Sequence, residues 1–188
     1  MEMETQNNRF ANKTIIIGVS GSIAVYKAVE LTSMLRKQGA AVHVIMTDNA
    51  QKFVTPLTFQ TISKNPVLTS LWDEGTSWQP NHISLADQAD LFVVAPATAN
   101  VVASFAQGLA IDFLSTAYLA TPAPVLIAPA MNGKMWEHPA TKNNAKILRD
   151  RGNIIVDPDD GLLACGYEGV GKLAALEKIE REITSILA

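Results

Sequence analysis

Runs of consecutive apolar residues alternate along the chain with segments in which apolar residues recur every three to four positions. The runs are short and rich in valine, isoleucine and alanine, which is typical of strands buried on both faces. The predicted strands cover residues 14–19, 41–47, 91–95, 125–130 and 153–156. The predicted helices cover residues 22–38, 100–107, 113–120, 138–151 and 174–187. This alternation predicts an α/β fold, with a doubly wound, Rossmann-like or flavodoxin-like parallel sheet and helices on both faces.

Some segments depart from this regular alternation. Residues 49–63 predict short helices separated by a proline, and residues 65–81 predict irregular structure around a short strand. Residues 157–171 are rich in glycine and predict a loop. Residues 1–12 are polar and have no apolar period, so we expect a disordered leader followed by a single domain over residues 13–188.

The composition narrows the classes of partner. Hydrophobic residues make up 48% of the chain, which is enough for a core, and the formal net charge is −3. Because lysines and arginines do not cluster, we expect no nucleic-acid partner. The apolar runs are too short to span a membrane, and the polar start does not have the form of a signal peptide. Cys165 is the only cysteine and the three histidines lack zinc-site spacing, so we expect a cytoplasmic protein without a metal.

The junction after the first strand has the composition of an anion-binding loop. It contains Gly18, Ser20, Gly21 and Ser22, where the glycines let the backbone approach an anion and the serines add hydroxyl donors. The spacing matches neither the dinucleotide fingerprint nor a Walker loop, so a mononucleotide phosphate is the ligand that remains. A helix cap with a tight turn is the alternative interpretation.

Two further junctions carry small or polar residues at the carboxyl ends of predicted strands, where doubly wound folds bind their ligands. Thr47 ends the second strand, and the polar residues there suit either ribose or ribityl hydroxyls or an ordinary helix cap. Ala97 would allow a flat ring to approach closely, while Thr98 and Asn100 could donate hydrogen bonds to it. Capping is again the alternative for Asn100.

The turn after the 125–130 strand is unusually rich in functional side chains. Met131 is followed by Asn132, whose amide could bind a carboxylate. Met135 and Trp136 follow closely, and a place in the core or in a contact between subunits is the favoured interpretation for both.

Two isolated residues have chemistry of their own. His82 precedes the 91–95 strand and could carry a proton near neutral pH, although a lone histidine is more often structural. Cys165 lies in a glycine-containing loop that could close over a site, although an unpaired cysteine usually acts as a small buried hydrophobe.

Taken together, these loops resemble the motifs of the homo-oligomeric flavin-containing cysteine decarboxylases over residues 14–173. The residues that carry the resemblance are 18–27, the segment around His82, 96–100, 129–132 with Met135 and Trp136, and 164–166 with Gly169 and Gly171. The resemblance implies that the loop from Ser20 to Ser22 holds the phosphate of FMN. It also implies that Thr47 and Phe53 flank the flavin and that Thr98 contacts it.

The same resemblance implies roles for the catalytic side. His82 would be the active-site base, and Asn132 would hold the substrate carboxylate beside Met131 and Ala164. Cys165 would protonate an intermediate and so complete the reaction. One departure is Ile111, which stands where the family commonly has an acidic residue, although the acid that follows it, Asp112, is kept.

The implied reaction is the FMN-dependent decarboxylation of a small-molecule substrate, 4′-phosphopantothenoylcysteine, to 4′-phosphopantetheine in coenzyme A biosynthesis. In the family the flavin oxidises the substrate thiol to a thioaldehyde, carbon dioxide leaves, and the hydride is returned. Family members bind FMN between subunits of a trimer-based assembly, a homotrimer or a homododecamer. Alternatives are a peptidyl-cysteine decarboxylase that stops at an enethiol, a flavin prenyltransferase, and a regulatory FMN-binding subunit. Cys165 favours the first reaction.

Overall fold

The computed structural model describes residues 8–71, 81–162, 166 and 168–188, with the backbone alone for residues 81–84. Among these residues, a six-stranded parallel sheet has the order β3-β2-β1-β4-β5-β6. The strands are β1 (Thr14–Val19), β2 (Ala41–Met46), β3 (Val67–Leu68), β4 (Leu91–Ala97), β5 (Val125–Pro129) and β6 (Ile154–Ile155). The order reverses between β1 and β4, the topological switch point of a doubly wound fold, so the predicted fold class is confirmed.

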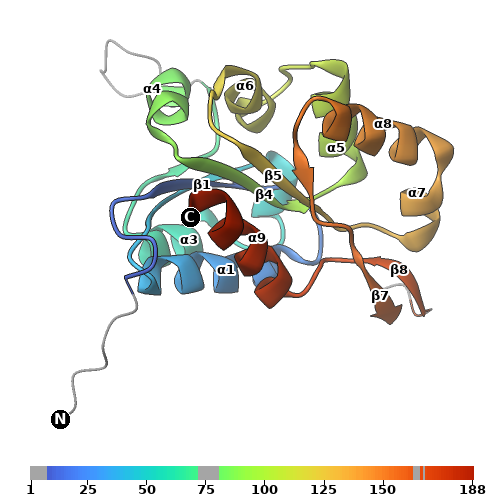
Figure 1. The fold of residues 1–188 in the computed structure, drawn as a ribbon, viewed down its shortest axis with the longest axis horizontal. Helices are drawn as coiled ribbons and strands as arrows, with labels where there is room; N and C mark the ends of the chain where they lie inside the picture. The colour runs from blue at the N-terminus through green and yellow to red at the C-terminus, as the bar shows by residue number, and fades with distance from the viewer. Residues whose placement is uncertain (1–7, 72–80, 163–165, 167) are drawn as a thin grey trace.

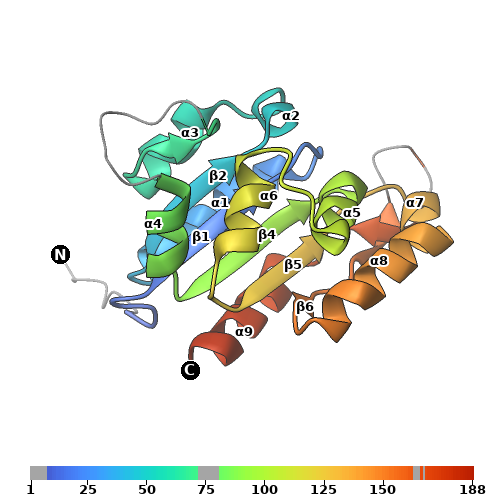
Figure 2. The same ribbon diagram turned by 90° about the horizontal axis from the view of Figure 1, so that it is seen from above.

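Helices cover both faces of this sheet, as Figures 1 and 2 show. One face carries α1 (Val25–Lys37), α3 (Pro56–Ser63) and α9 (Leu176–Leu187). The other carries α4 (Asn81–Gln88), α5 (Ala99–Gln107), α6 (Phe113–Ala120) and α8 (Pro139–Asp150). Two short helices, α2 (Asp48–Gln51) and α7 (Gly133–Glu137), directly follow the loops after β2 and β5.

The continuous apolar runs of the sequence are explained by burial on both faces. In β1, Ile15 and Ile17 belong to the core under α1 and α9, while Ile16 belongs to the core under α5 and α6. All three side chains are fully buried. A strand with one solvent-exposed face would instead alternate apolar and polar residues.

Two expectations about local structure were wrong. The glycine-rich segment 157–171 contains an antiparallel hairpin, β7 (Asp159–Leu162) and β8 (Glu168–Lys172), which lies beside α7 in Figure 1. The backbone of His82 lies in α4, so a helix separates it from β4 where we expected it to stand just before the strand. The glycines of the hairpin remove the side-chain alternation by which its strands could be detected from sequence.

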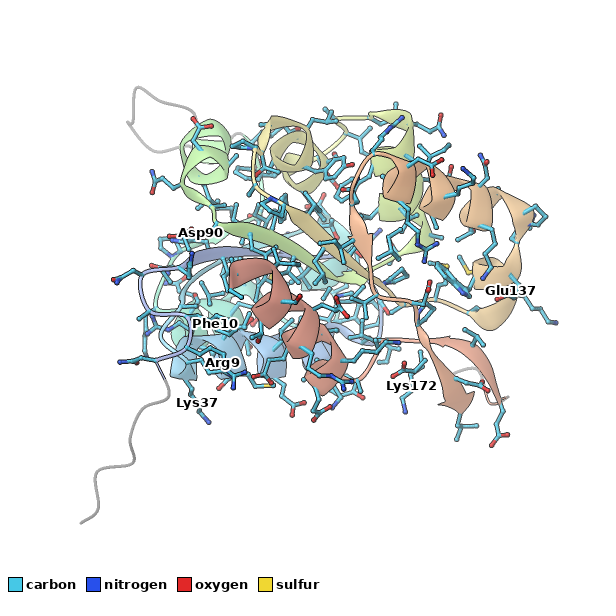
Figure 3. The ribbon with its side chains drawn as sticks, in the orientation of Figure 1. Arg9, Phe10, Lys37, Asp90, Glu137 and Lys172 are labelled. Carbon is cyan, nitrogen blue, oxygen red and sulfur yellow. The ribbon has the colours of Figure 1, made fainter. Side chains whose placement is uncertain are left out.

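The expectation of a disordered leader over residues 1–12 does not hold for its described part. Phe10 is only 1% exposed and packs in the core under α1 and α9. Its N–H donates to the carbonyl of Gln38, and Arg9 lies 3.4 Å from the Glu180 carboxylate of α9. Figure 3 labels Arg9 and Phe10 beside these two helices. Residues 8–12 are therefore part of the domain.

Candidate functional site

The loops that follow β1, β2 and β4 meet around a cavity of about 640 Å³, which we call the switch-point cavity. Its lining includes Ser20, Gly21, Thr47, Thr98, Asn100 and Asp112. Five of these six positions come from carboxyl ends of neighbouring parallel strands, where this fold places its ligand sites. The volume falls in the range of about 300–1,000 Å³ that small-molecule and cofactor pockets occupy.

Ser20 ties two walls of the switch-point cavity together. Its side chain is 1% exposed, and its hydroxyl donates to the carbonyl of Pro96 at 2.8 Å. The same oxygen accepts the N–H of Thr98 at 2.9 Å. These two bonds fix the loop after β1 against the end of β4 and the loop that follows it. The only hydroxyl hydrogen of Ser20 is already donated, which differs from the direct phosphate contact that we expected of this side chain.

Threonines cap two of the helices that begin at this cavity. Thr47 Oγ1 accepts the N–H of Ala50 at 3.3 Å at the start of α2, and Thr98 Oγ1 accepts the N–H of Val101 at 3.4 Å at the start of α5. In both cases the hydroxyl hydrogen stays available, because a threonine cap only accepts. A cap is thus present at both junctions, but after β4 it is Thr98 rather than Asn100, which lies inside α5. The caps leave the ligand-binding interpretation open.

Asp112 begins α6 at the same cavity and was not predicted as a site residue. Its carboxylate accepts the N–H of Ser115 at 2.8 Å and the Ser115 hydroxyl at 2.6 Å, while Ser115 Oγ accepts the N–H of Ile111 at 3.0 Å. The starts of α5 and α6, which carry the positive ends of the helix dipoles, thus both lie at the switch-point cavity. Asp112 and Ser115 form a capping box, and their spacing of three positions could have revealed it in the sequence.

Gly18 at the end of β1 and Gly21 in the loop after it serve packing in different places. A Cβ on Gly21 would lie 2.5 Å from the Cβ of Asn49, so only glycine lets this loop contact α2 at the cavity. A Cβ on Gly18 would collide with the Leu114 side chain and lie 3.2 Å from Phe92. Gly18 therefore makes room for α6 in the core rather than for a ligand.

Three expected cofactor residues lie in different surroundings. Asn100 lines the switch-point cavity, as expected. Ala97 is fully buried at the end of β4, and Phe53 is 50% exposed after α2. Neither is among the described residues that line this cavity, so a contact of either with a cofactor stays a prediction.

A second cavity of about 600 Å³ lies between α1, the turn after β5 and the β7–β8 hairpin, and we call it the hairpin cavity. Its lining includes Ser22, Tyr26 and Lys27 from the first loop and α1, and Met131 and Asn132 from the turn. The hairpin supplies Asp160, Gly171 and Lys172, the last of which is labelled in Figure 3. The expected phosphate residues thus separate, with Ser20 and Gly21 on one cavity and Ser22 on the other.

The turn that carries Asn132 is held by α7. Asn132 Oδ1 accepts the N–H of Lys134 at 2.9 Å and so caps this helix. Trp136 is 3% exposed, which confirms its structural interpretation, whereas Met135 is 48% exposed and lines the switch-point cavity. Met135 is therefore a candidate site residue outside the core, and the expected contact between subunits stays a prediction for it.

The rim of the hairpin cavity carries charges of both signs. Lys27 lies 3.0 Å from Glu30, and this hydrogen bond raises the pKa of the lysine above its usual 10.5. Lys27 and Lys172 face four acidic residues: Glu30, Asp159, Asp160 and Glu177. Lys27 therefore remains protonated at neutral pH and could contact an anionic group.

Other expected site residues cannot be placed as side chains. Cys165 and Ala164 lie outside the described residues, as does the side chain of His82. Of the α4 residues whose side chains are described, 85–88, none lines either cavity. By contrast, Thr69, Ser70 and Leu71 line the switch-point cavity although no sequence signal indicated them.

The described residues also bear on metal sites and membrane spans. Within the described ranges, His, Cys, Asp and Glu do not gather in groups of three or more that could hold a metal ion. Likewise, none of the described helices has the length and apolar character needed to cross a membrane.

A sequence model of the Flavoprotein family matches residues 3–188, and the chain belongs to this family. It is 51% identical over 168 residues to the coenzyme A biosynthesis bifunctional protein CoaBC of Bacillus subtilis, covering 89% of this chain and 41% of that protein. It thus spans less than half of that bifunctional relative. It is also 46% identical over 173 residues to the probable phosphopantothenoylcysteine decarboxylase of Streptococcus mutans, covering 91% of this chain and 97% of that protein.

Solved structures agree with this assignment. A variant of PPC decarboxylase complexed with pantothenoylaminoethenethiol superposes with a TM-score of 0.83 at 28% identity, covering 93% of this chain and 98% of that one. The FMN-dependent cysteine decarboxylase SpaF superposes with a TM-score of 0.80, also at 28% identity, over 94% of this chain and 99% of that one. The chain therefore shares its fold with PPC decarboxylase and with an FMN-dependent cysteine decarboxylase.

Proposed function

We propose that the chain is an FMN-dependent phosphopantothenoylcysteine decarboxylase, which converts 4′-phosphopantothenoylcysteine to 4′-phosphopantetheine in coenzyme A biosynthesis. The observation that carries the proposal is the adjacency of two cavities along one loop. Ser20 and Gly21 line the switch-point cavity, and Ser22 lines the hairpin cavity together with Asn132. A cofactor and a substrate need such adjoining spaces. The identities of 51% and 46% to relatives named for this pathway support the choice of substrate.

The switch-point cavity fits FMN in its size and in its donor groups. The hydroxyl hydrogens of Thr47 and Thr98 are available, because both side chains only accept in their caps. The start of α5, which is capped by the uncharged Thr98, favours a negative charge at the same cavity, whereas α6 begins with the Asp112 carboxylate. The phosphate and ribityl groups of FMN bind to hydroxyl donors and to the positive end of a helix dipole. When bound, FMN would supply the reversible two-electron oxidation of the substrate thiol that provides an electron sink for decarboxylation.

The residues of the hairpin cavity would bind and orient the substrate. Asn132 uses its Oδ1 to cap α7, so its Nδ2 is the atom that would donate to the substrate carboxylate. Met131 and Asn132 line this cavity together, in accordance with the substrate contacts implied by the resemblance. His82 as the base and Cys165 as the proton donor remain part of the proposal on the basis of the resemblance alone.

An oligomer based on trimers belongs to the same proposal. Met135 and Ile111 line the switch-point cavity and are 48% and 62% exposed, and Leu109 nearby in the chain is 48% exposed. Large apolar side chains beside a ligand site are typical of a surface that another subunit covers. Native mass spectrometry of the FMN-loaded protein should give the mass of three subunits or a multiple of it, and a monomer would contradict this part of the proposal.

We also propose a cytoplasmic location, which the lone Cys165 supports.

The experiment that tests the function is direct. The purified, FMN-loaded protein is incubated with 4′-phosphopantothenoylcysteine, and mass spectrometry follows the loss of carbon dioxide and the formation of 4′-phosphopantetheine. Protein without substrate and substrate without protein are the controls. A folded, flavin-loaded protein that does not convert this substrate would overturn the proposal.

A peptidyl-cysteine decarboxylase is the second candidate, because the similarity to SpaF extends over 94% of this chain. Its product would be an enethiol, two hydrogens lighter than the saturated thiol. Incubation with a peptide that ends in cysteine, analysed in the same way, distinguishes the two. Turnover of the peptide but not of the pantothenate derivative would select this alternative.

A further inference from the structure

Gly171 holds the β7–β8 hairpin directly against the turn that carries Asn132. The carbonyl of Gly171 accepts the N–H of Met131 at 2.9 Å. A Cβ at this position would lie closer to the Met131 carbonyl oxygen than real Cβ contacts allow, and 3.1 Å from the Gly133 nitrogen. Both neighbours are backbone atoms, so no side-chain rotation could relieve the contact. The φ angle of 153° also favours glycine.

The base of the hairpin is fixed on its other side as well. Leu173 and Ala174, which directly follow β8, are 6% and 2% exposed. The N–H of Ala175 donates to the Asp159 carboxylate at 2.8 Å, and Lys178 of α9 lies 3.2 Å from the same group. A side chain at position 171 would therefore displace the turn from Met131 to Gly133, because the hairpin base cannot retreat.

We propose that Gly171 is a positioning residue that couples the β7–β8 hairpin to the Asn132 turn and thereby sets the shape of the hairpin cavity. The consequence for the substrate rests on the proposed function, whereas the coupling itself does not. None of the described hairpin residues lines the switch-point cavity. Loss of the coupling therefore acts mainly on the substrate side, and on the cofactor side it reaches only Met135 of α7.

Gly161 provides a matched control for Gly171→Ala. It lies in β7 and has a φ of 149°, so Gly161→Ala has a comparable conformational cost. A Cβ there would meet only the Lys172 Cδ, at 3.7 Å, which is an ordinary contact. The two variants thus share the backbone strain and differ in the collision with the turn.

The first measurement is amide hydrogen exchange of the FMN-loaded proteins with single-residue resolution. Gly171→Ala should speed the exchange of the Met131 amide by about tenfold or more, since a hydrogen bond is lost, and Gly161→Ala should leave that rate within about twofold. The affinity for FMN should change less than about threefold in both variants. Unchanged exchange at Met131 in a folded Gly171→Ala protein would overturn the coupling, whatever the activity.

The second measurement is the kinetics with 4′-phosphopantothenoylcysteine. Gly171→Ala should lower kcat/KM by about tenfold or more, mainly through KM, while Gly161→Ala should stay within about threefold. Equal losses in both variants would reject a specific role for Gly171. If the wild-type protein has no turnover, the proposed function fails, but the exchange data still decide on the coupling.

A measurement on the wild-type protein covers the case in which Gly171→Ala does not fold. Under native conditions with increasing urea, the Met131 amide should open together with the amides of the β7–β8 ladder and share their dependence on urea. The Val94 amide, in the central strand β4, serves as the reference. A Met131 amide that opens independently of the hairpin would overturn the proposal.

Discussion

The switch-point cavity and the hairpin cavity share one loop but are built from different kinds of structure. The first lies where parallel strands end, and its walls are joined by the buried hydroxyl of Ser20. The second is closed by a two-stranded hairpin that meets the Asn132 turn through backbone contacts at Gly171. One cavity is thus a product of the sheet itself, and the other depends on a segment added beside it.

This difference indicates which part of the site can change without loss of the fold. Moving a strand end would disturb the sheet, so the cofactor side has little freedom to vary. The hairpin pairs with itself rather than with the sheet, and its residues can change shape and charge with less effect on the core. Variation in ligand preference on this fold is therefore expected on the hairpin side.

The largest effect that would sharpen this comparison is expected at Asn132. Asn132→Asp keeps an oxygen that can cap α7 but replaces the amide donor with a negative charge opposite the substrate carboxylate. Loss of a hydrogen bond to a charged group is worth about 1.5–3 kcal/mol, so kcat/KM should fall by roughly 10- to 150-fold. The melting temperature and the FMN affinity should stay close to those of the wild type.

Asn132→Ala is the matched control for the cap. It also removes the acceptor of the Lys134 N–H, and the loss of a cap costs about 1 kcal/mol, or about 2–4 °C in melting temperature for a domain of this size. Thermal unfolding and steady-state kinetics of both variants separate the two roles. Full activity in Asn132→Asp would contradict the carboxylate contact.

The variants Ser20→Ala and Ser22→Ala test the loop after β1, which the two cavities share. Ser20→Ala leaves the Thr98 N–H without its partner, which should cost about 1–3 kcal/mol of stability and weaken FMN and riboflavin alike, because both loops loosen. The Ser22 hydroxyl accepts the Ala24 N–H at 3.3 Å, and its hydrogen has no acceptor among the described residues. Ser22 lines the hairpin cavity, but the resemblance assigns it to the FMN phosphate, so Ser22→Ala should cost less than about 1 kcal/mol and weaken FMN without weakening riboflavin.

Thermal unfolding and flavin-binding titrations with both ligands provide the readout. An unchanged melting temperature in Ser20→Ala would show that its hydroxyl does not join the loops. If Ser22→Ala weakens FMN and riboflavin equally, the phosphate contact of Ser22 is wrong.

The smallest effect is expected at the support of α7. Lys142 Nζ lies 4.3 Å from the centre of the Trp136 ring and 2.9 Å from the Glu137 carboxylate, which is labelled in Figure 3. Since Lys142 is half exposed, Lys142→Ala should cost about 0.5–1 kcal/mol, or roughly 1–4 °C, in a thermal melt. Lys146→Ala, which loses only an exposed pair with Asp150, should cost less. A larger loss at Lys146 would reject the cation–π contribution.

The strands of the sheet and the positions of its junctions could be predicted from the sequence because burial on both faces leaves a continuous apolar run. The same logic predicted that Thr47 and Thr98 would come together, since parallel strands end at one edge. The hairpin could not be found, because its glycines leave no alternation to detect. Phe10 was missed because its neighbours are polar and its partners lie on α1 and α9, far away in sequence.

The difference between Ser20 and Ser22 lay beyond sequence reasoning for a related reason. Both are serines of one loop, and either hydroxyl could serve an anion. The two serines differ because the Pro96 carbonyl lies beside Ser20 and accepts the hydrogen of its hydroxyl. Gly18 shows the same limit, because its need for a small residue comes from Leu114 in the core rather than from a ligand.

The burial of Phe10 has a consequence for the order in which the protein can fold during synthesis. The core under α5 and α6 draws its buried residues from Ile16 to Leu148, whereas the opposite core joins Phe10 to Ile183 of α9. Arg9 and Glu180, which pair beside it, are 171 positions apart in the chain. At about 5–20 residues per second, the ribosome needs roughly 10–30 s to make that interval. The last 32 of those positions follow Leu148, so for roughly 2–6 s a nascent chain can close one face of its sheet, while the other stays open to chaperones and to aggregation.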